Sequence, residues 1–363
     1  MSRFGALSYD RDMSFRLWVS ALTFGAALLA QQSTQQTSTW TLDASGRRVE
    51  GPSYTAIEST QGSQRAETAQ SINGRMVPIQ SAEDRVLHQD AQRKEVERII
   101  RKYDATGNPG PPMRVRIEET KNPDGSTTLQ STTYEADING NLKLFERATT
   151  QIRKGDMTET STTVERATLN GSLQTTERST SVERKTEGGA QIDSTTYRRD
   201  ISGNFTPLMQ DVKRISKTGG EETTDAAHYV VDANGKLTLA SRAIDRVRTN
   251  PDGSQVSDTD VYSKLSVGNT GDANAGEPRL QQQVRRERTP GPGGAVIETT
   301  SVRARLPNDP SSFGAYEKTS QVTYTSIDAS GREVKTTETT AGRRDTNGQI
   351  VVDQGRVDHS VKK

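Results

Sequence analysis

Glycine-containing turns recur along this chain at a nearly constant spacing. Between Gly125 and Gly253, successive turn glycines are 15 to 18 residues apart. At this spacing one strand plus one turn takes about 16 residues and one hairpin about 32, a period typical of proteins that repeat one supersecondary unit. The spacing therefore predicts a long antiparallel meander of β-hairpins. The turn glycines are Gly125, Gly140, Gly155, Gly171, Gly188, Gly203, Gly219, Gly235 and Gly253.

Several of these turns share the pattern Asp-x-Asn/Ser-Gly. Asp favours the first position of a type I turn, and Gly favours the left-handed position that follows it. Together they form a three-residue hairpin loop with a bulge. This loop pairs Tyr134 with Leu144 and Tyr229 with Leu239, so apolar residues meet on one face of the sheet. The predicted structural turn residues are Asp137, Gly140, Asp200, Gly203, Asp232 and Gly235.

The composition limits how large a core the sheet can have. Apolar residues make up 30% of the chain and aromatic residues 5%, against roughly 45–50% apolar in ordinary globular proteins. The strands are rich in Thr, Ser, Glu and Arg, and cross-strand pairs of these residues each add roughly 0.2–1 kcal/mol. We predict an all-β fold, a long twisted sheet that stays open or coils on itself around a thin core. A largely unfolded polar chain is the alternative.

The N-terminus predicts export. Residues 17–30 read LWVSALTFGAALLA, an uncharged and mostly apolar run. A transmembrane helix needs ~20 such residues, so the run fits a secretory signal cleaved after Ala30, with an uncleaved anchor as the alternative. No later segment could cross a membrane as a helix, so we expect no transmembrane span in the mature chain. The expected location is extracellular, at the cell surface or in the periplasm.

The rest of the chain divides by the regularity of its turns. We predict a secretory signal at 1–30, a flexible Gln/Ser/Thr-rich arm at 31–39, regular hairpins at 40–265, a loop-rich insertion at 266–295 and a looser hairpin continuation at 296–363. Residues 81–103 alone resemble a capped helix. The spacing instead requires a turn near 91–93, so we predict two strands there.

No pattern in the sequence predicts catalysis, a cofactor or a metal. The chain has no cysteine, so disulfides and thiolate metal sites are impossible. It has no G-x-S-x-G motif, and its histidines lie far apart, at His88, His228 and His359. The best metal candidate is the acidic cluster Asp252, Asp258 and Asp260. It lacks the ligand spacing of a calcium loop, so we interpret these carboxylates as turn caps and solvated charges. With 48 basic and 47 acidic residues, a nucleic-acid partner is not expected.

The phrase Y-x-x-D-x-[NS]-G-[NK]-[LF] resembles the turn of RHS/YD-type repeats. In that exported family, strand–turn units spiral into a long β-sheet, often a hollow shell. The resemblance implies an exported β-repeat protein, although the period is longer here and the strands contain less Tyr. It does not imply a toxin, because no toxin or autoprotease segment is visible. The matching residues are Tyr134, Asp137, Gly140 and Leu142; Tyr197, Asp200, Gly203 and Phe205; and Tyr229, Asp232, Gly235 and Leu237.

An open sheet has two edge strands, which are templates for pairing with another chain. We therefore predict a structural function, as a cell-surface, matrix or filament component that polymerises through its sheet edges. The polar arm could add as a strand to a neighbour's edge. The alternative is a binding module that holds polysaccharide or another envelope component on the sheet face. Its aromatic strip would be Tyr134, Tyr197 and Tyr229, unless these residues only pack against Leu144 and Leu239.

Overall fold

The computed structural model describes residues 33–362 except 43–47, 61, 73–74, 138, 233, 265–277, 307–308 and 345–349. The described residues are almost entirely β-strand, and none of their helices is long and apolar enough to cross a membrane. The predicted signal at 1–30 lies outside them. The strands are β1 Ser33–Leu42, β2 Arg48–Thr60, β3 Ser63–Ile72, β4 Arg75–Gln89, β5 Arg93–Lys102, β6 Met113–Lys121, β7 Thr127–Ala136, β8 Leu142–Lys154, β9 Met157–Ala167, β10 Leu173–Thr186, β11 Gly189–Arg199, β12 Phe205–Thr218, β13 Glu221–Val231, β14 Leu237–Thr249, β15 Gln255–Ser263, β16 Arg279–Pro290, β17 Val296–Leu306, β18 Asp309–Phe313, β19 Glu317–Ile327, β20 Glu333–Arg344 and β21 Ile350–Lys362, with one 3₁₀ turn, η1 Pro292–Gly294.

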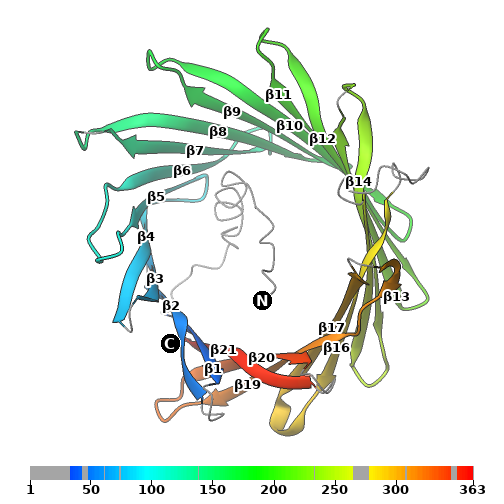
Figure 1. Ribbon diagram of the computed structural model, residues 1–363. Helices are drawn as coiled ribbons and strands as arrows, with labels where there is room; N and C mark the ends of the chain where they lie inside the picture. Colours follow the sequence, from blue (N-terminus) through cyan, green and yellow to red (C-terminus); the bar gives the residue numbers. More distant parts are fainter. Residues whose placement is uncertain are drawn as a thin grey trace.

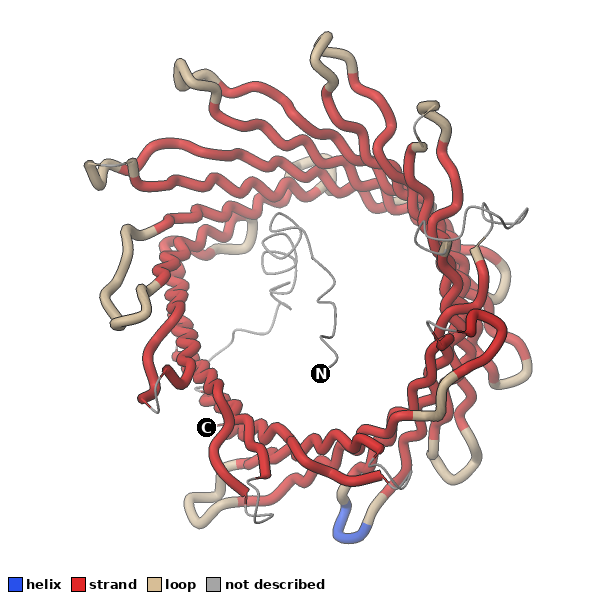
Figure 2. The backbone as a smooth tube through the Cα atoms, viewed as in Figure 1, coloured by secondary structure: helices blue, strands red, loops and turns tan. Residues whose placement is uncertain are grey.

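The strands form one antiparallel meander that closes on itself (Figures 1 and 2). Each strand pairs with the next in sequence, except that β17 pairs with β19 past the short strand β18. The first strand, β1, pairs with β2 on one side and with the last strand, β21, on the other. The 21 strands less β18 therefore make a closed barrel of 20 strands.

The predicted all-β hairpin meander is confirmed, but the open or coiled sheet is wrong. The reason lies in the predicted flexible arm, since Ser33–Leu42 is a strand. It pairs from Ser33↔Lys362 to Thr41↔Gln354 along β21. The hydroxyl of Thr37 also donates a hydrogen bond to the carboxylate of Asp358 across this seam. The arm does add to a sheet edge, but the edge belongs to its own chain, and closure leaves no free edge in the barrel.

The hairpin register predicted from the turn chemistry is confirmed. Tyr134 pairs with Leu144, and Tyr229 pairs with Leu239. At the first of these turns the Asp137 N–H donates to the Asn141 carbonyl oxygen at 2.9 Å, and Gly140 has a φ of 82°. The Asp137 carboxylate accepts two further backbone N–H groups, so one side chain holds the whole loop.

A second bulge follows these turns, and the turn spacing does not predict it. An extra residue enters the second strand of the hairpin five positions after the turn glycine, which shifts the pairing register by one. Such a bulge bends the strand and increases its local twist. Because it recurs at one height, it divides the wall into a short rim segment and a longer body. The inserted residues are Phe145, Thr176, Leu208 and Ala240.

Residues 81–103 form two strands, as predicted. The β4 and β5 strands are joined at residues 90–92, where the Asp90 carboxylate accepts the backbone N–H groups of Gln92 and Arg93. The predicted loop-rich insertion is only partly irregular, because Arg279–Pro290 is strand β16 and pairs with both neighbours.

The register assigns every strand residue to one of two faces, because paired residues share a face and successive residues alternate. A closed wall crowds side chains on its concave surface, so the face with more buried side chains is the inner face. Nine buried residues lie on this face: Val77, Asp84, Val96, Arg98, Val115, Thr133, Val164, Glu177 and Thr337. Four lie on the outer face: Trp40, Ala69, Glu95 and Thr132.

The turn carboxylates predict an acid limit for the fold. Hydrogen bonds from the Thr106 hydroxyl and the Asn108 N–H lower the pKa of Asp104 to about 2, whereas an unfolded chain titrates Asp near ~3.9. A carboxylate whose pKa is lowered by folding stabilises the folded state while it is ionised, above about pH 4. That stabilisation is lost as the pH falls towards 2 and the carboxylate is protonated. We expect the urea unfolding midpoint to fall below about pH 4, and to fall less in Asp104→Asn. Identical acid dependence in both proteins would contradict this assignment.

Candidate functional site

The interior of the barrel is the largest candidate site. With strands ~4.8 Å apart and tilted by ~40°, 20 strands enclose a cylinder roughly 40 Å across between backbones. Side chains fill a barrel of about 8 strands, whereas barrels of about 16–18 strands leave an aqueous channel. Among the described residues only seven apolar residues are buried, and they lie within the wall or at its turns. The side chains of the strands therefore cannot fill the lumen.

Hydroxyl groups and paired charges make the inner face polar. Arg98 and Asp84 form two hydrogen bonds of 2.6 Å across β4 and β5, and both side chains are buried. Val115 and Thr133 continue this row onto β6 and β7. Elsewhere on the inner face, hydroxyls pair across strands, as between Thr150 and Thr162 at 2.9 Å. The inner wall is thus suited to contact water and polar solutes.

The body of the outer face is also polar. Arg116 pairs with Glu95 at 2.6 Å, Arg242 with Asp225 at 2.7 Å and Arg246 with Asp260 at 3.1 Å. The strands of membrane barrels usually show the lipid an apolar band ~25 Å tall. In the described residues ion pairs interrupt any such band on this wall. Seven aromatic residues of the barrel strands lie on the outer face: Trp40, Tyr134, Tyr197, Phe205, Tyr229, Tyr262 and Tyr324.

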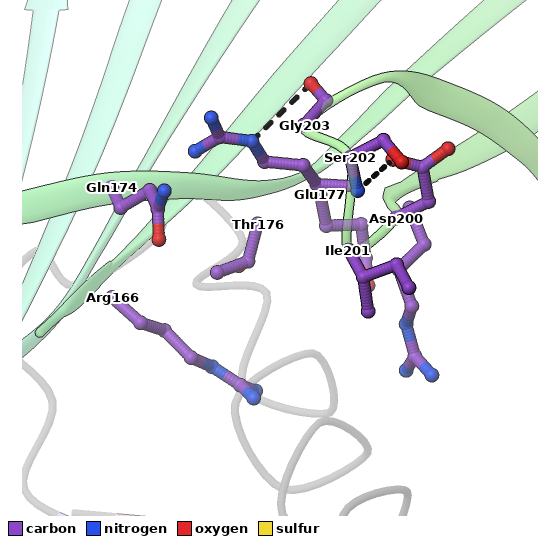
Figure 3. A pocket seen from close by; sticks show the side chains of 10 residues that line it. Arg166, Gln174, Thr176, Glu177, Asp200, Ile201, Ser202 and Gly203 are labelled. Atoms are coloured by element: carbon purple, nitrogen blue, oxygen red, sulfur yellow. Dashed lines mark hydrogen bonds between the residues drawn. The ribbon is translucent and has the colours of Figure 1, made fainter.

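A polar pocket of about 600 Å³ opens where β9–β11 meet the turn before β12 (Figure 3). Arg166, Gln174 and Thr176 lie on one side of it, and the turn Asp200–Gly203 lies on the other. Register places Arg166, Gln174, Glu177 and Arg198 on the inner face, so the pocket belongs to one mouth of the lumen.

Three guanidinium groups and two carboxylates line this pocket. Arg166 pairs with Glu146 at 2.9 Å, outside the lining, and Arg199 donates to the Gly203 carbonyl oxygen at 3.3 Å. The Asp200 carboxylate accepts the backbone N–H groups of Ser202 and Asn204. Guanidinium groups bind carboxylates, phosphates and hydroxyls through several N–H groups at once. The pocket can therefore hold a polar or anionic solute, and sequence spacing alone did not bring its residues together.

The three tyrosines predicted as one aromatic strip are not brought together. Tyr134 lies on β7, Tyr197 on β11 and Tyr229 on β13, with intervening strands between them. Each faces an apolar partner on the next strand, namely Leu144, Pro207 and Leu239. The predicted turn residues lie at one rim of the barrel, and Asp200 and Gly203 also line the pocket.

The acidic candidates Asp252, Asp258 and Asp260 have separate partners. Asp252 accepts the N–H and hydroxyl of Ser254, Asp258 lies 3.6 Å from Arg285, and Asp260 pairs with Arg246. Within the described part of the chain, no three His, Cys, Asp or Glu side chains are placed to share a metal ion. The histidines have local partners: Asp90 for His88, Asp211 for His228 and Thr336 for His359.

Comparison with known proteins gives no family for this chain. No family model and no curated protein matches it. Similar solved structures include OccK8 (OprE) of Pseudomonas aeruginosa, at 11% identity and a TM-score of 0.46 over 92% of this chain and 96% of that one. A BenF-like porin from Pseudomonas fluorescens Pf-5 matches at 9% identity and a TM-score of 0.44, over 92% and 98% of the two chains. Both TM-scores lie below 0.5, and the closed barrel is defined by the strand pairing of this chain.

Closure corrects several expectations from the sequence. The resemblance to RHS/YD-type repeats was wrong, because the sheet does not spiral but joins its own first strand after one circuit. The shared turn phrase reflects the chemistry of a bulged hairpin loop. Polymerisation through sheet edges, the filament function and the alternative of a module binding on an open sheet face are likewise wrong, because the barrel has no open edge. The expectation of no transmembrane span is also corrected. That expectation was based on helical segments only, and a closed β-barrel is the other architecture that can cross a bilayer.

Proposed function

We propose that the protein is a water-filled β-barrel pore of the cell envelope, and that polar solutes pass through its lumen. The observation that carries this proposal is the pairing of β1 with β21, which closes 20 strands into a cylinder. The polar inner face and the charged pocket at one mouth support it. The apolar run at 17–30 supports export to the envelope. Passage through such a lumen requires no catalysis.

The two faces of one strand provide a direct test, because the chain has no cysteine of its own. Thr162 lies on the inner face of β9, and its neighbour Thr163 lies on the outer face. We expect the chain to produce conductance steps in a planar lipid bilayer. A maleimide that carries a long polyethylene glycol chain should reduce each step in Thr162→Cys, because the tethered polymer occupies part of the lumen, and should leave Thr163→Cys unchanged.

The matched pair also defines the contradicting result. Both positions lie at almost the same height in one strand, so they differ only in the face that carries the thiol. If bilayers show no conductance steps although the chain is folded and membrane-bound, the pore function is wrong. Equal block in the two variants would show that current does not pass through the lumen.

A further inference from the structure

The two ends of the barrel differ in the chemistry of their turns. Leu169 and Ile201 occupy the same position in the turns that follow β9 and β11, and both are fully exposed, at 112% and 107% of the reference area. Consecutive turns alternate between the two ends, so these turns share one rim. The second position of a type I turn accepts most residues, so the turn itself does not require an exposed Leu or Ile. At the opposite end, four turn tips are Pro-Asp, Glu-Gly or Gly-Gly, at 123–124, 187–188, 219–220 and 251–252, and the Asp328–Gly331 turn carries Ala329 at the position of Leu169 and Ile201.

The outer face just behind these tips is mostly apolar and aromatic, with Glu165 and Arg199 as its charged members. This rim collar lies between the turns and the second bulges, and its members include Tyr134, Leu144, Tyr197, Phe205, Tyr229 and Leu239. Each strand contributes about two outer-face residues to the collar, which corresponds to a height of ~7 Å at ~3.3 Å per residue. Beyond the bulges the outer wall carries ion pairs such as Arg242–Asp225.

We propose that this rim contacts lipid, with Leu169 and Ile201 entering a bilayer surface and the rim collar lying at its interface. Amphipathic surfaces enter the boundary between headgroups and acyl chains by ~5–10 Å, which matches the collar height. Tyr is favoured at that level because its ring is apolar and its hydroxyl remains hydrated. The apolar groups recur at one height on successive hairpins of a curved wall, and a flat lipid surface can meet all of them together. This inference concerns the rim and not the lumen. It describes a barrel whose rim rests in a bilayer surface, whereas the pore function places the whole wall across the bilayer, so the two are tested separately.

The test compares the rim with the opposite end in the full-length chain. We expect Leu169→Ser combined with Ile201→Ser to weaken sedimentation with phosphatidylcholine vesicles by about tenfold or more, because two exposed apolar side chains are lost. Ile327, at the end of β19, provides the control. It is 67% exposed and lies at the other end of the barrel, so Ile327→Ser should bind as the unchanged chain does. Equal binding by all three proteins, or equal loss in both variants, would overturn the proposal.

A second readout excludes binding through the N-terminal apolar run. A tryptophan is placed at one site in a Trp18→Phe, Trp40→Phe background, and its fluorescence is measured with vesicles containing brominated phosphatidylcholine. We expect strong quenching for Leu169→Trp and none for Ile327→Trp. An unquenched Leu169→Trp on vesicle-bound protein would overturn lipid contact at the rim, whether or not the lumen conducts.

Discussion

Replacing Gly189 with alanine is expected to cause the largest loss of stability of any glycine-to-alanine change among the described residues. Gly189 begins β11 and pairs with Ser216 on β12. A Cβ at this position would overlap the carbonyl oxygen of Ile215 and lie 2.8 Å from its carbonyl carbon. Both atoms belong to the backbone, so no side chain can rotate to make room. We expect a loss of roughly 3 kcal/mol or more in the free energy of unfolding.

Gly155 provides the matched control for this substitution. It lies in the turn between β8 and β9, and an added Cβ would have no neighbour closer than 3.9 Å. Gly155→Ala should therefore be neutral or slightly stabilising, because it restricts the unfolded chain without a clash. Urea unfolding followed by circular dichroism measures both variants. If Gly189→Ala unfolds at the same urea concentration as Gly155→Ala, the close approach of β11 to β12 is not present in solution.

The local structure of the hairpins could be predicted because it depends on neighbouring residues. Asp137 and Gly140 determine their loop by hydrogen bonds within five residues, and the loop then determines that Tyr134 faces Leu144. The same reasoning gave two strands for residues 81–103, where local propensity alone favoured a helix. In both cases a repeated turn restricted the register of the strands on either side.

Closure could not be predicted in the same way. The pairing of Ser33 with Lys362 joins the two ends of the described chain, and no turn links them. The residues of β1 are mostly Gln, Ser and Thr, which suit a free polar tail as well as a strand. Whether 20 strands close or coil depends on twist accumulated over all the hairpins. The second bulges contribute to that twist, and they add a residue without changing the turn pattern.

The candidate site was missed for a related reason. The pocket joins Arg166, Glu177 and Arg198 from three strands with a turn that the sequence marked only as structural. Register places these residues on the inner face, but a face becomes a lumen only when the sheet closes. The repeated tyrosines were recognised from the sequence. That they lie at one height near one rim could not be predicted, because the rim exists only in the closed barrel.

The barrel seam is the second position where one methyl group should have a large effect. Trp40 on β1 faces Gly355 on β21, and the indole ring covers the position where a side chain would be. A Cβ on Gly355 would overlap two ring carbons and lie 2.6 Å from Nε1, while Trp40 itself is only 8% exposed. We expect Gly355→Ala to lower the free energy of unfolding by about 1–3 kcal/mol, because the ring must leave its place.

A double-mutant cycle separates this clash from general damage to β21. Trp40→Ala should destabilise by removing the ring, but Gly355→Ala should then add little, giving a coupling energy of about 1 kcal/mol or more. In a Trp18→Phe background, Trp40 is the only tryptophan in the chain, so its emission reports the seam in proteins that retain it. A red shift in Gly355→Ala before global unfolding would show that β1 separates from β21 first. If the two substitutions are additive and the emission is unchanged, the ring does not lie on Gly355 and this seam does not hold the barrel closed.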